Sequence, residues 1–259
     1  MDHFTPVDTL DASNYLRAVT TSIGPTTSVG DLHFLMPVTG FENNQKSVTP
    51  PGFDKEYGLF LTIDGTAFGT VAGGPASTFA NLNITLWADP LNNDGTPSVS
   101  QTSDPAFSNG MTNDIVLATG TMVSASMSLD PTTMLRTADF VDRMTPTFAG
   151  TVLLDGSIKS GDLLEVKTTT PQDTFTSYPQ SDGSVINVVD GGTATVTLDP
   201  QGTILLPNIP SDALHLASGP KFIHGHAMRM LVAHVCHARL VGAVQLDRAT
   251  EVGPFARPA

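Results

Sequence analysis

The chain has 259 residues and a formal net charge of −13, because 25 acidic residues outnumber 12 Lys and Arg. This charge argues against a nucleic-acid-binding protein, which needs basic side chains to neutralise phosphates. The single Cys excludes an internal disulfide framework and a Cys-rich zinc site.

The strands predicted in the first half of the chain end at turn residues. Residues 57–63 are rich in Leu, Phe and Ile, and the strand is expected to end at Asp64-Gly65. Residues 82–87 alternate apolar and polar side chains, as a half-buried strand does. Residues 115–129 predict one long strand of small residues, in which Gly120 suits a bulge or bend.

The second half of the body continues this pattern. Residues 148–159 predict a β-hairpin around Asp155-Gly156, because both residues of an Asp-Gly pair tolerate the positive φ of a tight turn. Further strands are expected at residues 163–167, 185–189, 194–198 and 203–206. Strands do not alternate with helices, so a parallel α/β fold is not expected. The sequence therefore predicts an all-β protein, either an antiparallel β-sandwich or a β-barrel.

The last residues are a different kind of sequence. Residues 221–259 hold five basic and two acidic residues, a net charge of +3, which leaves −16 for residues 1–220. An approximate 3.6-residue apolar period over residues 227–246 predicts a helix there. We expect a single β-rich domain at 1–220 and a basic, His-containing tail at 221–259 that is helical or disordered. No window of about 18 apolar residues predicts a membrane span.

Four His residues of the tail are a candidate transition-metal site: His224, His226, His234 and His237. In an extended chain His224 and His226 share a face, and on a helix His234 and His237 do. Their spacing matches no established metal motif, and carboxylates that would support the ligands are not close in sequence. The alternative, which we favour, is a terminal segment that is incidentally rich in His.

A long polar loop is expected at residues 91–113, and loops of this length are usually functional, inserted or disordered. The turn that leads into it offers Asp89, Asn92 and Asp94 as oxygen ligands for calcium, a hard cation that needs several of them. The EF-hand pattern fails, because Leu91 and Asp94 occupy positions that require a ligand and a Gly, and no Glu closes the loop. A calcium site of another kind is one interpretation, and a solvated turn is the default.

Catalytic signatures are weak. The Gly-x-Ser-x-Gly nucleophile motif is absent. Cys236 has only His234 and His237 as sequence neighbours, whereas catalytic partners normally come from distant sequence. A glycosidase needs a carboxylate pair, and 25 acidic residues give many pairs without selecting one. The sequence therefore predicts no catalytic residues, and calcium is the one candidate cofactor.

Several phrases of the sequence resemble one family, and they occur in the same order. Residues 4–17, which include Phe-Thr-Pro-Val-Asp-Thr-Leu-Asp-Ala, open the likeness, and it continues at residues 35–41, 57–61, 79–90 and 113–120. Together they resemble bacterial exported PEP-CTERM proteins of the flocculation-associated type, over about residues 4–225. The resemblance implies an exported, β-rich protein at the surface of a Gram-negative bacterium that makes exopolysaccharide, with no catalytic residues to carry over.

The chain departs from that family at both termini. Residues 1–4 do not begin a signal peptide, because they lack a basic and an apolar region. The Pro-Glu-Pro sorting tail of the family is also lacking, and the basic His-containing segment stands in its place. Sorting by an exosortase is therefore in doubt for this chain.

Three hypotheses for function follow. The first is a non-enzymatic extracellular protein with a structural or adhesive role at a bacterial surface or in a biofilm or floc matrix, with exopolysaccharide or other matrix components as partners. The second is a ligand- or calcium-binding β-barrel module. The third is a hydrolase of unrecognised family.

Overall fold

The computed structural model describes residues 4–22, 27–70, 78–130, 132–199 and 202–209. By its internal contacts the chain divides into two units, Met1–Pro210 and Ser211–Ala259. The fold given below is that of the first unit, because the second lies outside the described residues. The helix predicted at 227–246 and the four tail His residues lie outside them too.

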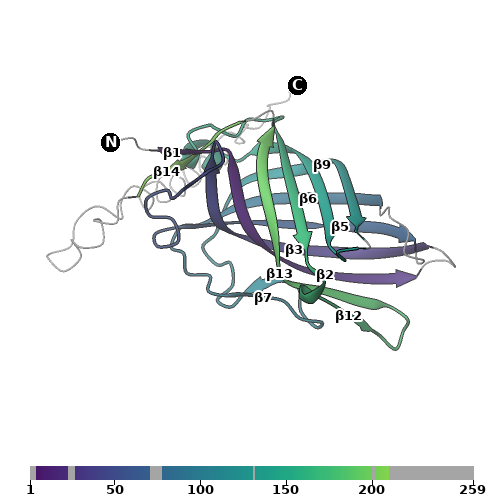
Figure 1. The fold of residues 1–259 in the computed structure, drawn as a ribbon. Helices are drawn as coiled ribbons and strands as arrows, with labels where there is room; N and C mark the ends of the chain where they lie inside the picture. Colours follow the sequence, from purple (N-terminus) through teal and green to yellow (C-terminus); the bar gives the residue numbers. More distant parts are fainter. Residues whose placement is uncertain (1–3, 23–26, 71–77, 131, 200–201, 210–259) are drawn as a thin grey trace, which may run out of the picture. The chain divides into compact units, whose positions relative to one another are not determined.

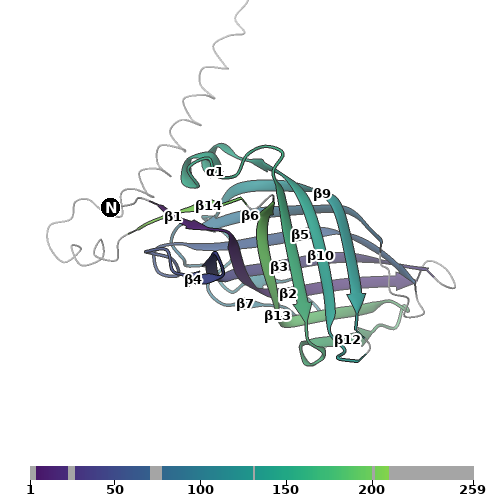
Figure 2. The ribbon, with the colours of Figure 1, turned by 45° about the horizontal axis from the view of Figure 1, so that its top comes forward.

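Eight strands of the first unit form a closed antiparallel β-barrel (Figure 1 and Figure 2). In order around the barrel they are β2 (Thr9–Ser22), β3 (Thr27–Asn43), β5 (Gly58–Thr70), β6 (Thr78–Asp89), β9 (Ile115–Leu129), β10 (Arg136–Pro146), β11 (Leu163–Thr170) and β13 (Val185–Asp199). The barrel closes at β13, which pairs with β11 on one side and with β2 on the other. The predicted all-β antiparallel fold is confirmed, in its barrel form.

Shorter elements flank the barrel. The strand β1 (Phe4–Val7) pairs with β14 (Ile204–Pro207), β4 (Lys46–Val48) with the end of β3, and β12 (Phe175–Pro179) with the start of β13. A small hairpin of β7 (Pro97–Ser98) and β8 (Ala106–Phe107) lies inside the long loop. Among the residues that the structure describes, the helical elements are α1 (Phe148–Leu153) and the 3-10 turn η1 (Gln172–Thr174). In the part of the chain that the structure describes, no helix is long and apolar enough to cross a membrane.

Alternate residues of each strand point into the barrel, and this alternation decides which side chains form the core. In β10 the side chains of Ala138, Phe140 and Asp142 are buried, whereas the residues between them are partly exposed. The Phe140 ring meets Phe34 of β3 edge to face, with 5.5 Å between centroids, and it meets Phe79 of β6 at the same distance. These rings reach across the barrel, so its middle is filled by side chains.

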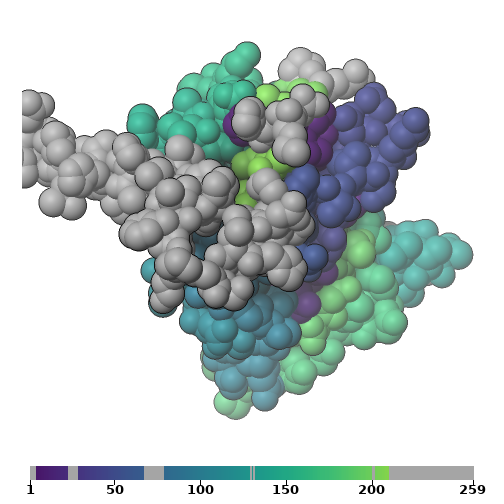
Figure 3. All heavy atoms as spheres, turned by 90° about the vertical axis from the view of Figure 1, so that its left-hand side faces the viewer, coloured from purple at the N-terminus to yellow at the C-terminus, as the bar shows by residue number. Residues whose placement is uncertain are grey.

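The barrel has two ends of different construction. At the loop end, β6 finishes at Asp89, β9 starts at Ile115, and α1 and the β1–β14 pair lie close by (Figure 2). Figure 3, a view onto this end, shows segments from several parts of the chain meeting there. At the opposite end, which we call the mouth, β2 finishes at Ser22 and β10 starts at Arg136.

Aromatic side chains close the loop end. Tyr57 is fully buried, and its hydroxyl donates to the carbonyl oxygen of Pro207 in β14 at 3.2 Å. Its ring packs edge to face on Phe53, which packs in the same way on Phe41 of β3. The segment between β3 and β5 is therefore fastened both to the barrel and to β14.

The loop between β6 and β9 runs from the loop end along the outer face of the barrel. Phe107 packs edge to face on the outward-facing Phe60, whose ring is stacked on Trp87. Further along, Arg17 on β2 forms an ion pair with Asp104 at 2.8 Å. The loop is thus held against the barrel at several points (Figure 1).

The hairpin predicted at residues 148–159 is wrong, because α1 forms there. Thr147 caps the helix: its hydroxyl oxygen accepts from the Gly150 N–H at 3.0 Å. Gly150 lies so close to β9 that a Cβ at this position would stand 1.9 Å from the Leu117 carbonyl oxygen. The cap and the close packing outweigh the strand tendency. Asp155-Gly156 still adopts the expected positive φ, but its turn follows a helix.

One expected strand end and one expected bulge are also misplaced, and two strands predicted separately form one. Asp64-Gly65 lies inside β5, and Asp190-Gly191 lies inside β13, which joins the two strands predicted at 185–189 and 194–198. At both positions the strand register shifts, so these pairs mark bulges. Gly120 is paired in register, and its missing Cβ makes room for the sulfur of Met144. An Asp-Gly pair suits a bulge as well as a turn, so composition alone does not separate them.

Candidate metal centre

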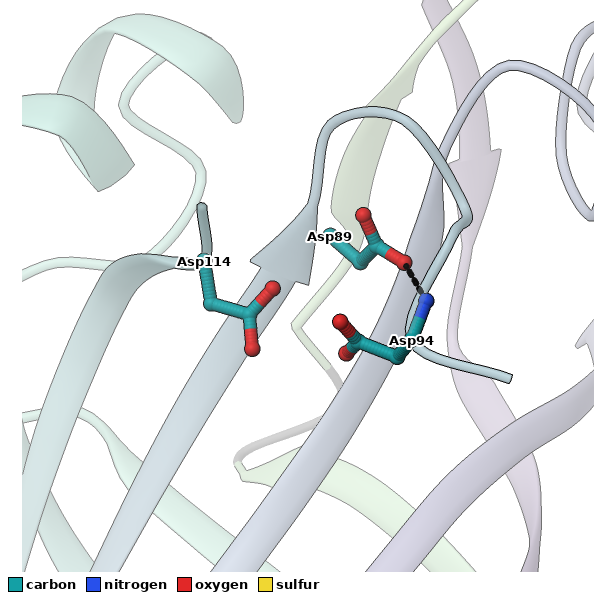
Figure 4. A group of neighbouring side chains, drawn as sticks. All are labelled: Asp89, Asp94 and Asp114. Carbon is teal, nitrogen blue, oxygen red and sulfur yellow. Dashed lines mark hydrogen bonds between the residues drawn. The ribbon is translucent and has the colours of Figure 1, made fainter. Parts of the chain in front are cut away.

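Three carboxyl groups converge at the loop end of the barrel (Figure 4). Asp89 is the last residue of β6, Asp94 lies in the loop that follows, and Asp114 immediately precedes β9. One oxygen of each carboxyl lies within 4.8 Å of the others. Because β6 and β9 are antiparallel neighbours, the end of one lies beside the start of the other. The three acids therefore mark the point where the long loop leaves the barrel and returns to it.

The Asp89 carboxylate, 2% exposed, organises the turn that opens the loop. Its Oδ1 accepts from the Leu91 N–H at 3.0 Å and from the Asn113 side-chain amide at 3.4 Å. Its Oδ2 accepts from the N–H groups of Asn93 at 2.6 Å and Asp94 at 3.2 Å. Four donors thus fold the loop back over this side chain and fix its orientation.

The carboxyl groups of Asp94 and Asp114 are different, because, when both are ionised, none of the described residues donates a hydrogen bond to their oxygens. Asp94 is only 5% exposed, and both of its carboxylate oxygens are buried without a partner. The two oxygens of Asp114 are also buried and unpartnered. An unpaired buried polar group is unfavourable, so such groups are rare in folded proteins. Two ionised carboxylates cannot satisfy each other, because each can only accept.

Burial and mutual repulsion raise the pKa of both groups. Burial raises the pKa of Asp94 to about 6, and the nearby Asp89 carboxylate adds to the effect. Burial raises the pKa of Asp114 to about 7, with further contributions from the charges of Asp94 and Asp89. A proton shared between Asp94 and Asp114 offsets this repulsion, and a bound cation does so more completely.

The chemistry of the donor set suits a hard cation. All the candidate ligand atoms are carboxylate oxygens, which calcium and magnesium prefer over nitrogen or sulfur ligands. Two oxygens that bind one calcium ion lie at most about 5 Å apart, because each Ca–O distance is about 2.3–2.6 Å. The spacing of the Asp89, Asp94 and Asp114 oxygens fits that limit.

Of the three predicted calcium ligands, the structure brings Asp89 and Asp94 together. The Asn92 side-chain amide instead donates to Asp54 Oδ1 at 3.4 Å. Asp114 was not predicted as a ligand. The signal that points to it is its position directly before the strand that follows the loop, because hydrogen-bonded antiparallel strands bring the two ends of their connection together.

Comparison of the chain with protein-family models, with curated proteins and with solved structures returned no match. The resemblance to exported PEP-CTERM proteins therefore stays a prediction. The four His residues of the tail also stay a prediction, since they lie outside the described residues.

Proposed function

We propose that this protein is a non-enzymatic, calcium-binding β-barrel in which Asp89, Asp94 and Asp114 hold the ion. The observation that carries the proposal is the buried Asp94 carboxylate, whose two oxygens lack any donor and face the other two acids (Figure 4). A bound calcium ion would balance the negative charge of these oxygens and take the place of the missing donors.

Calcium would fasten the long loop at its base. Asp89 ends one of the two barrel strands that the loop connects, Asp114 lies directly before the other, and Asp94 belongs to the loop itself. One ion bound to all three cross-links the loop to the barrel, next to the contact of Phe107 with Phe60. The role of the ion in this proposal is structural, because it stabilises one arrangement of a surface loop.

The biological setting in the proposal comes from the family resemblance. We place the protein outside the cell or at its surface, with a structural or adhesive role in a biofilm or floc matrix and with exopolysaccharide as partner. Extracellular calcium-binding modules work at dissociation constants of about 10⁻⁴–10⁻³ M, which suits a site with only three carboxylates. Deletion of the gene should reduce cell aggregation and matrix retention in the presence of calcium, and unchanged aggregation would count against this role.

The metal site is tested by calorimetric titration of the metal-free protein with calcium at pH 7.5. We expect a single binding event of sub-millimolar to millimolar affinity in the wild type, and none in the variants Asp94→Asn and Asp114→Asn. The exposed Asp31→Asn on β3 is the matched control, since it removes one negative charge far from the three acids in the sequence and leaves them intact. Absence of binding by the wild type up to 10 mM calcium, about ten times the weak end of the expected range, would falsify the proposal.

A further inference from the structure

The mouth of the barrel opens into a cavity of about 220 Å³, which shares no residue with the three acids. The strand register orders its lining by depth. Ala18 of β2 pairs with Leu32 of β3, and one step further in Leu16 pairs with Phe34. Phe34 packs on Phe140 from the opposite wall, so aromatic rings form the floor. The deep part of the cavity is therefore mostly apolar, and the buried Thr168 is its polar exception.

The lining becomes polar towards the rim. Thr170 lies opposite Arg136 in the pairing of β11 with β10, at the level where β10 begins. On the neighbouring strands β13 and β2, the Asn187 side-chain amide donates to the Thr20 hydroxyl at 3.4 Å. The Thr20 hydroxyl and the Asn187 amide thus lie at the entrance, whereas Thr170 is buried and its hydroxyl lies 3.5 Å from the side-chain amide nitrogen of Asn14.

Arg136 is the cation of this cavity. Its guanidinium lies 3.8 Å from the centroid of the Phe175 ring, and its Nη1 donates to Gln172 Oε1 at 2.7 Å. The ring and the hydrogen bond hold the guanidinium in place while most of its five N–H donors stay available. Among the described residues, the ion pairs are those of Arg17, His33 and Lys167, and none includes Arg136.

A fixed cation without a counter-ion is unusual in a chain with a net charge of −13. A planar guanidinium fork matches the two oxygens of a carboxylate. Burial lowers the pKa of Arg136 below its ordinary value, yet an Arg side chain stays charged in proteins. The half-buried charge at the rim therefore favours an anionic group at the entrance.

We propose that the mouth binds a small amphiphilic monocarboxylate, with its carboxylate on Arg136 and its apolar body in the cavity above Phe34. The volume limits the size of the ligand. A cavity of about 150 Å³ holds benzene, so one of about 220 Å³ accommodates an apolar body of roughly eight to ten carbons. Eight-stranded barrels have room for one small ligand of this kind.

The experiment titrates the full-length protein with octanoate, octanol and acetate at pH 7.5 by calorimetry, with calcium present throughout. Octanoate carries both features of the proposed ligand, octanol only the apolar body, and acetate only the anion. We expect octanoate to bind with a dissociation constant below about 1 mM, and at least about tenfold more tightly than either of the others. Octanol lacks the charge-assisted hydrogen bond, whose loss changes affinity by about this factor. Acetate lacks the apolar chain, in which each buried CH2 contributes about 0.8 kcal/mol.

Two variants assign the site. Arg136→Met keeps the length and apolar stem of the side chain, and it should weaken octanoate about tenfold or more while octanol binding stays within about twofold. Ala138→Phe fills the cavity from the neighbouring inward position and should abolish binding of both. Arg143→Met is the matched control, because Arg143 is exposed on the outer side of the same strand. Melting temperature and circular dichroism verify that each variant is folded.

Three results would overturn the proposal: no octanoate binding to the wild type, equal binding to Arg136→Met, or equally tight binding of acetate. If Arg136→Met does not fold, Ala138→Phe and the comparison of octanoate with octanol decide instead. The outcome is independent of the calcium site, because Asp94→Asn should leave octanoate binding unchanged.

Discussion

The two ends of the barrel differ in how they are closed and in the charge that they carry. The loop end is closed by Tyr57 and by the returning loop, and it concentrates negative charge where two Asp carboxylates lack any donor. The mouth is lined mostly by apolar side chains and carries the positive charge of Arg136, which forms no ion pair with any described residue. The same ring of strands therefore offers a cation site at one end and an anion site at the other. The difference in charge comes from the loops and from the residues at the ends of the strands, since the interior between the two ends is largely apolar.

The largest expected effect comes from Gly substitutions, one at each end. Gly150→Ala at the loop end places a Cβ 1.9 Å from a β9 carbonyl oxygen, so α1 must move. We expect a loss of about 3 kcal/mol of stability, since severe overpacking has this magnitude. Gly30→Ala at the mouth brings its Cβ to 3.3 Å from the Thr20 hydroxyl, which can shift, and the loss should stay below about 1 kcal/mol. Urea unfolding measures both, and equal losses would show that the two ends are packed alike.

Calcium should stabilise the loop end alone. At about one hundred times the dissociation constant, binding adds about 2.7 kcal/mol, which raises the melting temperature of a barrel of this size by about 5–10 °C. The single Trp87 stacks on Phe60 next to the loop, so its fluorescence should change with the same midpoint. Asp94→Asn should remove both responses, whereas Arg136→Met should keep them. Loss of the calcium response in Arg136→Met would mean that the ends are coupled.

A third prediction concerns Asp142, inside the barrel between the two ends. This side chain is fully buried, its carboxylate oxygens have no hydrogen-bond partner, and burial raises its pKa to about 7. The folded state therefore binds more protons than the unfolded state between pH 4 and pH 7, so stability from this group is lost as the pH rises through that window. Asp142→Asn should flatten this part of the pH profile and gain about 2 kcal/mol at pH 8.

The pH profile of Asp142→Asn is compared with that of Asp31→Asn, which removes an exposed carboxylate and should follow the wild type. Calcium should not alter the contribution of Asp142, because this residue is not among the three acids of the metal site. If calcium flattens the pH profile of wild-type stability as much as Asp142→Asn does, the pH dependence belongs to Asp94 and Asp114 instead.

The last prediction concerns the helix cap at the loop end, for which the expected loss is modest. Thr147→Ala removes the acceptor for the Gly150 N–H and should lower stability by about 1 kcal/mol. Thr147→Ser keeps that acceptor and should recover most of the loss. Because α1 contacts β9 just after Asp114, the Ala variant should also bind calcium slightly more weakly. Unchanged stability would show that α1 is held by packing of Gly150 alone.

Part of the strand content of the barrel was accessible from the sequence, because strand composition and period-two alternation are local properties, whereas β2, β3 and β10 were not predicted. Residues 82–87 were recognised by alternation and lie in β6, and the strands predicted at 115–129 and 163–167 lie in β9 and β11. The helix at residues 148–153 was not accessible, since its formation depends on a Gly that fits against a distant carbonyl group. Local pattern carries no information about such a contact.

The candidate site was accessible only in part for a related reason. Asp89 and Asp94 are close in sequence, so the turn composition alone suggested them. Asp114 joins them because β6 and β9 are neighbours in the barrel, which depends on topology. Arg136 was not singled out either, since its lack of a counter-ion and its stack on Phe175 are tertiary facts.

The pairing of β2 with β13 also bears on how the molecule is made. Residues 9–20 of β2 pair with residues 185–197 of β13, so the barrel closes only after nearly all of its sequence has been synthesised. Contacts this distant along the chain slow folding, because a long segment must be ordered before they form. Until then the free edges of the unfinished sheet can pair with other nascent chains. Once β2 and β13 pair, the unfinished sheet has lost these free edges, and the new chain can no longer pair with other chains through them.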